Sequence, residues 1–249
     1  MRLKDKIAIV TGAASGFGKA IAETYAREGA CVAVVDINGQ GARDVARSLG
    51  ARAMHVACDV TRKAEVDAMV GEVLARYGGL DIMVNNAGFT HRRQPMLEVS
   101  EDEFDRVYAV NVKAIYLAAL AVVPVMEKRG GGVIINTAST AGVRPRPGLT
   151  WYNGSKGAVI VLTKSMAAEL APKNIRVCAI NPVMGETGML EQFMGAPDTP
   201  ENRRAIEATI PLGRLSRPAD VANAALFLAE PASEFLTGVA LEVDGGRCI

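Results

Sequence analysis

The chain has 249 residues, of which 49% are hydrophobic, and a formal net charge of +1 at pH 7. This length fits one α/β domain with a sizeable core, and the near-neutral charge favours neither nucleic acid nor a membrane as a partner. The N-terminal residues hold too few apolar positions for a signal peptide, and the longest apolar run, 114–126, is shorter than a membrane span. We therefore expect a soluble, cytoplasmic protein.

The cysteines show no paired spacing. There are four of them, at 31, 58, 178 and 248, and the chain has only two histidines. A disulfide framework or a zinc site requires tighter clustering of such residues. We therefore expect reduced thiols and no structural metal.

A glycine-rich turn, TGAASGFG at 11–18, follows the first apolar run and precedes a helical pattern. Backbone N–H groups at the positive end of a helix stabilise phosphate, and the missing Cβ atoms let it approach. The Gly-x-x-x-Gly-x-Gly spacing is not the commonest dinucleotide fingerprint, and an ordinary strand-to-helix turn is the alternative. Because strand, turn and helix stand in the right order, the sequence predicts a nucleotide-binding turn.

Strand and helix patterns then alternate along the chain. Strands are expected at 30–35, 53–58, 80–84, 133–137, 175–180 and 240–243, with helices between most of them. Thr61 is expected to cap the helix that ends at Tyr77, and Ser100 to Glu103 reads as a capping box. Val- and Ile-rich strands separated by helices predict a single Rossmann-type α/β domain over 1–249. Its doubly wound parallel sheet would have about seven strands and helices on both faces.

Asp36 ends the second predicted strand, about 20 residues beyond the glycine turn. A carboxylate at this place hydrogen-bonds the adenosine ribose 2′-hydroxyl of NAD and repels the 2′-phosphate of NADP. No arginine stands in the turn or directly after Asp36 to receive such a phosphate. The alternative is that Asp36 only caps the next helix. The sequence favours NAD over NADP.

Tyr152 and Lys156 lie on one face of a predicted helix, because four residues make just over one turn. A neighbouring ammonium is expected to lower the pKa of a tyrosine. Such a phenol can give or take a hydroxyl proton while hydride moves to or from nicotinamide. Ser139, at the end of the fifth strand, can hydrogen-bond the substrate oxygen. Taken alone, Tyr-x-x-x-Lys also occurs by chance in surface helices.

These motifs together resemble the short-chain dehydrogenase/reductase family over essentially the whole chain. The matching segments are TGxxxGxG at 11–18, Asp59-Val60, NNAG at 85–88, Asn111, Ser139, Tyr152-x-x-x-Lys156 and Asn181-Pro182. The resemblance implies a catalytic tetrad of Asn111, Ser139, Tyr152 and Lys156. Tyr152 would be the acid/base, Ser139 would orient the carbonyl or alcohol, and Asn111 would support a water on a proton relay.

The resemblance also implies the cofactor contacts, with Lys156 holding the nicotinamide ribose and Asp59 and Val60 at the adenine. The expected cofactor-binding residues are Gly12, Ser15, Gly16, Phe17, Gly18, Asp36, Asp59, Val60, Asn86, Ala87, Gly88, Tyr152, Lys156, Pro182, Gly185 and Thr187. Two departures from the family pattern stand out. A glycine is displaced to Gly185, and Gly154 lies inside a helix, where a close backbone approach would explain it.

The substrate end is expected to involve residues 184–211, which are rich in Met and apolar side chains among Gly and Pro. This composition favours a mobile lid with an apolar inner surface, while a segment packed into the core is the alternative. Met184 and Met189 are the candidate lid contacts. Trp151 either lines the pocket or only packs.

Two arginine pairs, Arg92-Arg93 and Arg144-Pro145-Arg146, lie in loops at the carboxyl ends of strands, where ligands bind in such sheets. Arginine suits carboxylate, sulfonate or phosphate. The prolines allow at most one of the second pair to face inward, and we choose Arg144 as the anchor of an anionic substrate. Solvated arginines or contacts to another subunit are the alternative.

Within the predicted helix 104–126, the segment 114–120 is apolar on all sides, so a second subunit is expected to cover part of it. The family resemblance implies pairing through this helix and the Tyr152 helix, giving a homotetramer or a homodimer. The expected function is NAD-dependent interconversion of a secondary alcohol and a ketone. A 3-oxoacyl-thioester reductase and a non-catalytic NAD-bound regulator are the alternatives.

Overall fold

The computed structural model describes residues 1–249 and alternates strands with helices along nearly the whole chain. In chain order the elements are β1 (Ile7–Thr11), α1 (Gly16–Arg27), β2 (Cys31–Asp36), α2 (Gly39–Leu49), β3 (Ala53–Ala57), α3 (Lys63–Tyr77), β4 (Ile82–Asn85), α4 (Glu101–Tyr108), a π-helical segment (Ala109–Lys113), α5 (Ala114–Arg129), β5 (Gly132–Thr137), α6 (Thr150–Leu170), β6 (Ile175–Pro182), α7 (Leu190–Met194), α8 (Pro200–Glu207), α9 (Pro218–Ala229) and β7 (Ala240–Val243).

The strands form one parallel, seven-stranded sheet in the order β3-β2-β1-β4-β5-β6-β7. This sheet confirms the expected doubly wound α/β fold. The chain moves outward in one direction from β1 to β3 and then returns to the other side of β1 with β4. In open parallel sheets, ligands bind beyond the carboxyl ends of the strands at such a switch point.

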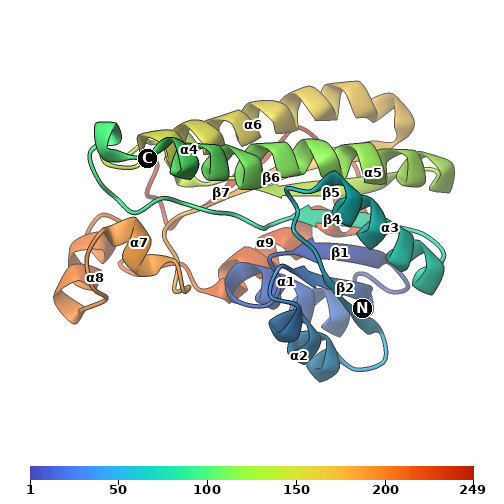
Figure 1. Cartoon of the computed structure of the whole chain (residues 1–249). Coiled ribbons are helices and arrows are strands. Elements are labelled where there is room, and N and C mark those ends of the chain that lie inside the picture. The colour runs from blue at the N-terminus through green and yellow to red at the C-terminus, as the bar shows by residue number, and fades with distance from the viewer.

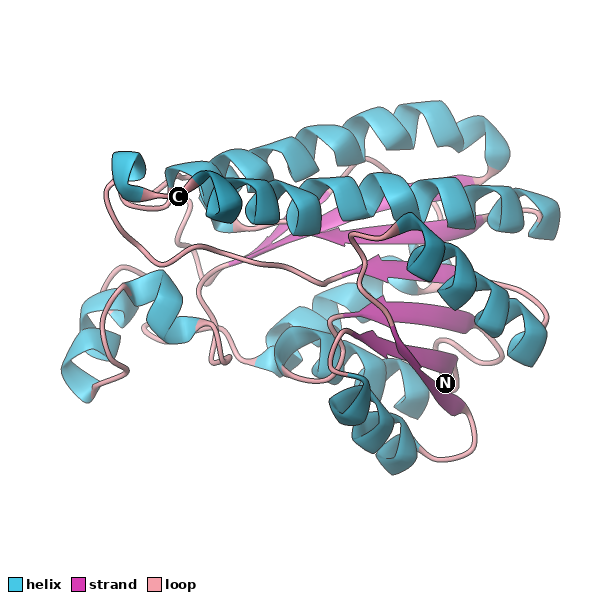
Figure 2. Cartoon of the chain, in the orientation of Figure 1, coloured by secondary structure: helices cyan, strands magenta, loops and turns pink.

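Each face of the sheet has its own apolar core, because successive strand residues point to opposite faces. In β1, Ala8 and Val10 pack with α1, α2 and α9, whereas Ile7 and Ile9 pack with α3, α5 and α6. Figure 1 shows α1, α2 and α9 on one side of the sheet and α3, α5 and α6 on the other. The magenta strands in Figure 2 lie between these two helix layers.

The helix expected at 104–126 is longer than its apolar run. α4, the π-helical segment and α5 join into a 29-residue helix, Glu101–Arg129, and the predicted Ser100–Glu103 capping box opens it. By length and composition this helix could cross a membrane, but core helices of soluble proteins pass the same test. Here α5 packs on α3, β4 and β5, which places it in the helix layer of the sheet.

Two local expectations have clear outcomes. The cap at Thr61 is wrong: α3 begins after Arg62 with no side-chain cap, and the Thr61 hydroxyl instead donates to Asp59 Oδ1 at 2.7 Å. Gly154 does lie in a close contact, since a Cβ built there would be 3.1 Å from the Tyr108 hydroxyl. That contact supplies the physical reason for a glycine inside α6.

The segment 184–211 folds into α7 and α8 beyond the carboxyl edge of the sheet, apart from the two helix layers (Figure 1). A small apolar cluster of its own holds it together, formed by Val183, Met184, Leu190, Met194, Ile210 and Leu215. The segment therefore has an apolar inner surface and packs as a separate unit. It belongs to neither of the two sheet cores.

Candidate active site

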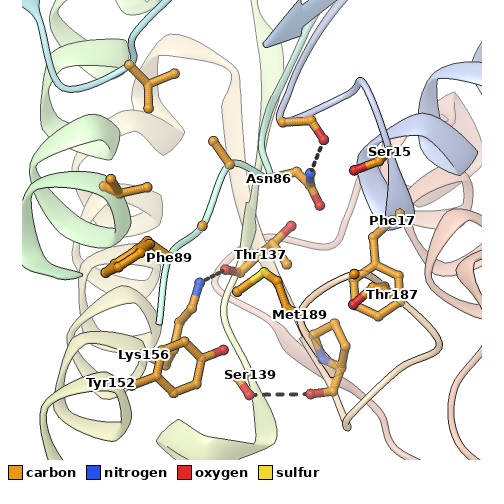
Figure 3. Close-up of a pocket in the computed structure, with 18 of the residues that line it drawn as sticks. Ser15, Phe17, Asn86, Phe89, Thr137, Ser139, Tyr152, Lys156, Thr187 and Met189 are labelled. Carbon is orange, nitrogen blue, oxygen red and sulfur yellow. Dashed lines mark hydrogen bonds between the residues drawn. The ribbon is translucent and has the colours of Figure 1, made fainter. Parts of the chain in front are cut away.

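A cavity of about 710 Å³ opens at the carboxyl edge of the sheet. Most of the expected cofactor contacts line it: Gly12, Ser15, Gly16, Phe17, Asp36, Asp59, Val60, Asn86, Ala87, Gly88, Tyr152, Lys156, Pro182, Gly185 and Thr187. Figure 3 shows Tyr152, Lys156 and Ser139 on one side of this cavity and Ser15, Phe17 and Thr187 on the other. Residues far apart in sequence thus meet at one place.

The glycine turn is shaped by contacts that only glycine permits. A Cβ at Gly18 would lie 2.2 Å from the Gly12 carbonyl oxygen, so Gly18 sits beneath the turn and does not line the cavity. Gly12 and Gly16 have φ of 62° and 56°, a region that side chains disfavour. Ser15 caps α1 without a side-chain hydrogen bond, which leaves the first-turn N–H groups open to a ligand. This cradle fits a phosphate.

Asn86 fixes the turn against the end of β4. Its amide nitrogen donates to the carbonyls of Thr11 and Gly12 at 2.9 and 3.2 Å. The Thr11 hydroxyl in turn accepts from the backbone N–H groups of Asn86 and Ala87 at 3.0 and 3.1 Å. These bonds make the two neighbouring strand ends one rigid wall of the cavity.

Asp36 stands at the cavity wall between the glycine turn and the start of α2. Its two carboxylate oxygens accept from Ala14 N at 3.0 Å and Asn38 N at 2.9 Å. The helix cap itself is Asn38, whose side chain accepts from Gly41 N, so Asp36 is not the capping residue. Each carboxylate oxygen keeps a second acceptor site, and the residue lines the cavity. The residue can therefore take a further donor.

Gly185 and Thr187 join the loop after β6 to the glycine turn. A Cβ at Gly185 would lie 2.4 Å from the Phe17 ring, so the displaced glycine makes room for that ring. Thr187 lies beside Gly16, where a built Cβ would be 3.4 Å from its methyl group. The departure from the family pattern therefore has a packing reason.

Tyr152 and Lys156 project from α6 into the cavity, with Ser139 beside the tyrosine (Figure 3). The Lys156 ammonium donates to the Thr137 carbonyl at 2.7 Å and lies 5.8 Å from the centre of the Tyr152 ring. The Ser139 hydroxyl accepts from Ala141 N at 3.1 Å, which fixes its position. The Tyr152 phenol and the Ser139 hydroxyl therefore lie together in the cavity, where they could exchange a proton or a hydrogen bond with a substrate oxygen, and the Lys156 ammonium lies behind the tyrosine ring.

The pKa of Tyr152 differs from the expected direction. Burial raises it to about 12, while the Ser139 hydroxyl and the Arg146 charge act to lower it. Burial also lowers the pKa of Lys156 to about 8. The expectation that Lys156 would lower the pKa of Tyr152 is wrong for the protein alone, because removal from water outweighs any attraction between the two groups.

Asn111 lies in the π-helical segment and is buried below the main cavity, whose wall it does not form. Its side-chain oxygen accepts from Phe89 N, and its amide nitrogen donates to Phe89 O and to the Ser155 hydroxyl, at 2.9 to 3.0 Å. These bonds occupy the amide and tie α6 to the loop after β4. The structure therefore shows Asn111 holding neighbouring elements together, and its expected part in a proton relay stays a prediction.

The structure divides the substrate candidates. Met184 and Met189 line the cavity, but Arg144 and Trp151 do not. The Arg144 guanidinium points away and donates to the Arg247 carbonyl at 2.5 Å. Trp151 donates to the Met96 carbonyl at 3.1 Å and packs edge-on against Phe104. Of the second arginine pair, it is Arg146 that lines the cavity.

Several lining residues were not chosen as site residues from the sequence, although Phe193 lies in the expected lid. Thr137 supplies the carbonyl that holds Lys156, Ile37 lies exposed beside Asp36, and Phe193 packs on Tyr152. Ile37 could have been predicted from the sequence. It is a large apolar residue directly after the carboxylate that ends β2, a position that faces the ligand cavity. Thr137 ends β5 and Phe193 lies in α7, and their places in the cavity wall follow from tertiary packing.

Outside this cavity the titratable residues form no comparable site. The four cysteines are free thiols, and no group of three or more His, Cys, Asp or Glu residues is arranged to hold a metal ion.

Comparisons with known proteins identify the family of the chain. The family model described as enoyl-(acyl carrier protein) reductase matches residues 12–247. The chain is 54% identical to 4-formylbenzenesulfonate dehydrogenase of Comamonas testosteroni, covering all of both chains, and 39% identical to 3-oxoacyl-[acyl-carrier-protein] reductase of Thermotoga maritima, again over both full lengths. A solved 3-ketoacyl-(acyl-carrier-protein) reductase from Brucella melitensis, complexed with NADH, is 46% identical with a TM-score of 0.94, over 99% of this chain and 100% of that one. The chain therefore belongs to the short-chain dehydrogenase/reductase family and is an oxidoreductase that acts on CH–OH groups with a nicotinamide cofactor.

Proposed function

We propose that the protein uses NAD to interconvert an alcohol and the corresponding carbonyl compound, with Tyr152 as the acid/base. The observation that carries this proposal is a single cavity with Asp36 at one end and Tyr152, Ser139 and Lys156 at the other. When bound, the nicotinamide supplies the hydride acceptor for oxidation and, once reduced, the hydride donor. A secondary alcohol and a ketone are the expected pair.

The residues of this chain would handle the proton and the substrate oxygen. In reduction the Tyr152 hydroxyl donates its proton to the carbonyl oxygen, and in oxidation it accepts the alcohol proton. The Ser139 hydroxyl donates a hydrogen bond to the same oxygen and keeps it in line. Lys156, already held by the Thr137 carbonyl, has further N–H donors for the hydroxyl groups of the nicotinamide ribose.

The NAD preference rests on Asp36. No lysine or arginine in the cavity wall stands beside this carboxylate: Lys156 bonds to Thr137, Arg106 stacks on Phe89 at 4.2 Å, and Arg146 belongs to the loop before α6. A 2′-phosphate would meet the negative charge without a cation to receive it. The exposed side chain of Ile37 offers the adenine ring an apolar surface.

Substitution of Asp36 tests this preference. Asp36→Ala removes both a hydrogen-bond acceptor and a repulsive charge, so the ratio of kcat/KM for NAD to that for NADP should fall about tenfold or more. Asp36→Asn keeps an acceptor for Ala14 N and controls for loosening of the turn. A wild-type protein that prefers NADP would refute the proposal.

A 3-oxoacyl-thioester reductase is the second candidate. Two relatives carry that description, and one of them was solved with NADH, so a preference for NADH does not separate the candidates. The more similar relative is named for an aryl aldehyde, 4-formylbenzenesulfonate, which favours a compact substrate.

A substrate panel followed by NADH absorbance decides between them. It should contain secondary alcohols, sugars, benzylic alcohols, hydroxy acids and, in the reductive direction, acetoacetyl-CoA. We expect the highest kcat/KM with an alcohol and NAD. Dominant reduction of acetoacetyl-CoA would favour the thioester reductase. Binding of NADH without turnover of any compound would favour a non-catalytic regulator.

We also propose a cytoplasmic homotetramer. Tyr116 and Leu120 on α5 are 60% and 47% exposed, and Val161 on α6 is 63% exposed, so both helices present apolar surface to solvent. Four unpaired cysteines are consistent with a reducing compartment. Light scattering should give a tetramer mass, and Leu120→Glu should reduce it. A monomeric wild type would contradict this assembly.

A further inference from the structure

Arg146 stands in the wall of the catalytic cavity, in the loop between β5 and α6. Its backbone carbonyl accepts from the Asn153 amide of α6 at 2.8 Å, and the next carbonyl, that of Pro147, accepts from Arg93 Nε at 3.3 Å. The loop is thus fixed from both sides. Arg146 is half-buried, and its side chain is held near Tyr152 by a rigid backbone.

The guanidinium of Arg146 has no partner within the chain. It forms no hydrogen bond and no ion pair, although it is partly removed from water. Its charged neighbours are Arg93 and Arg247, which repel it, and no carboxylate is among them. Neither of these two arginines is paired with an acid either. A half-buried cation among other positive charges raises the free energy of the folded protein unless an anion from outside the chain pairs with it.

Large apolar side chains line the same cavity as this cation. The Phe193 ring meets the Tyr152 ring edge-on, with 5.1 Å between centroids, and Met184 and Met189 lie in the same wall. Met184 belongs to the small apolar cluster of the segment 184–211, and Phe193 packs both on that cluster and on Tyr152. An aromatic or other flat apolar body fits such a surface.

We propose that Arg146 is the specificity-determining residue for an oxyanion group, a carboxylate or sulfonate, on the end of the substrate remote from the reacting carbon. The inference rests on the proposed function, because the reacting carbon is placed at Tyr152 and Ser139. The planar fork of arginine matches two oxygens of either group. The apolar body lies between the two ends, against Phe193 and the two methionines. Arg144 has no part in this recognition.

Matched substrates test the inference. 4-(1-Hydroxyethyl)benzoate and 4-(1-hydroxyethyl)benzenesulfonate are secondary alcohols that carry the anion, and 1-(4-methylphenyl)ethanol has the same ring without it. Arg146→Gln should lower the ratio of kcat/KM for an acidic alcohol to that for the neutral one by about 10- to 100-fold. The change should appear mainly in KM, and Arg146→Lys should restore part of it. Arg144→Ala, in the same loop but outside the cavity, should leave the ratio unchanged.

Two kinetic results would overturn the inference. One is an equal loss for acidic and neutral alcohols in Arg146→Gln, and the other is a wild type that prefers the neutral alcohol. The two acidic substrates show whether the site favours carboxylate or sulfonate.

A binding measurement separates this inference from the proposed function. 4-Methylbenzoate and toluene-4-sulfonate cannot react, and calorimetry in the presence of NADH measures their affinity without turnover. The wild type should bind at least one of them, and Arg146→Gln should weaken that binding about tenfold or more. If this holds while no alcohol is oxidised, the anion site stands and the proposed function fails. If the wild type binds neither anion, or the variant binds both equally well, the anion site is refuted.

Discussion

The two ends of the cavity are built in different ways. The nucleotide end is made of backbone: the glycine turn lies under strand ends that Asn86 and Thr11 tie together, and a Cβ at Gly18 has no room. The substrate end is made of side chains from two loops, with Phe193 and Met189 on a segment that packs on itself and Arg146 on another. A backbone-built site restricts which residues fit, whereas a side-chain-built site can change its ligand by substitution.

The two ends also differ in how well their charged side chains are paired with hydrogen-bond partners. At the nucleotide end, Asp36 is partly exposed and accepts two backbone N–H groups. At the catalytic end, Lys156 is buried with one carbonyl partner and Arg146 has none. We therefore expect substitutions that remove a buried charge at the catalytic end to lower activity and raise stability. Substitutions at the glycine turn should not raise stability in this way.

The largest effect is expected at the catalytic end. Tyr152→Phe removes the hydroxyl and keeps the ring that packs on Phe193, so kcat should fall by about 10²- to 10⁴-fold while NADH still binds. Steady-state kinetics on a proven substrate, with NADH titration as the control for folding, checks this. A variant that keeps near-normal kcat would remove Tyr152 from the chemistry.

The pH dependence should separate the two directions of the reaction. Oxidation needs the ionised form of Tyr152, and burial raises the pKa of this residue to about 12. Below that pKa, kcat/KM for oxidation should rise by about tenfold per pH unit, and kcat/KM for reduction should not rise. Measurement of both directions from acid to alkaline pH checks this. Identical profiles in the two directions would contradict it.

Stability should improve when the buried ammonium is removed. Burial lowers the pKa of Lys156 from 10.5 to about 8, so the unfolded chain holds this proton more tightly than the folded one. The resulting cost is full below the folded pKa and disappears as the pH rises past the unfolded value. In the protein without cofactor, Lys156→Met should raise Tm near neutral pH by several degrees, and less at alkaline pH. Lys164→Met, at an exposed position of α6, is the matched control and should change little. An equal gain at both pH values would refute this account.

Single methyl groups at the nucleotide end and in a helix should change stability in opposite directions. Gly18→Ala places a Cβ against the Gly12 carbonyl, and a cost of about 1–3 kcal/mol should lower Tm by roughly 2–12 °C and weaken NADH binding. Gly71→Ala, in the open middle of α3, meets no atom within 4 Å and should be stabilising by about 0.5–1 kcal/mol. Thermal unfolding of both variants checks the contrast. If both shifted Tm in the same direction, the tight fit at Gly18 would be in doubt.

The contrast between the two ends explains what the sequence could predict. The sheet can be predicted from Val- and Ile-rich strands between helices. The nucleotide-binding turn can be predicted from the spacing of its glycines, which allows the backbone and a ligand to approach closely. α2 was predicted with its true ends, because Gly50 stops it. These features are local, so one stretch of sequence contains them.

The remaining features depend on tertiary structure. Arg144 and Arg146 alternate with prolines, and which one faces the cavity depends on the conformation of the folded loop, in which the Arg144 guanidinium donates to the Arg247 carbonyl. Trp151 lies next to Tyr152 in sequence but packs on Phe104, because neighbouring helix residues point in different directions. The pKa of Tyr152 depends on burial, which the Tyr-x-x-x-Lys spacing does not reveal.

The central claim is that Asp36 makes the nucleotide end of the cavity selective for NAD over NADP. The most direct test is the affinity of the wild-type protein for the two reduced cofactors. Titration with NADH and with NADPH at one salt concentration gives two dissociation constants from the same sample. The account predicts that NADH binds about tenfold or more tightly than NADPH, because the Asp36 carboxylate accepts from a ribose hydroxyl and repels a phosphate. Equal affinities, or tighter binding of NADPH, would contradict it.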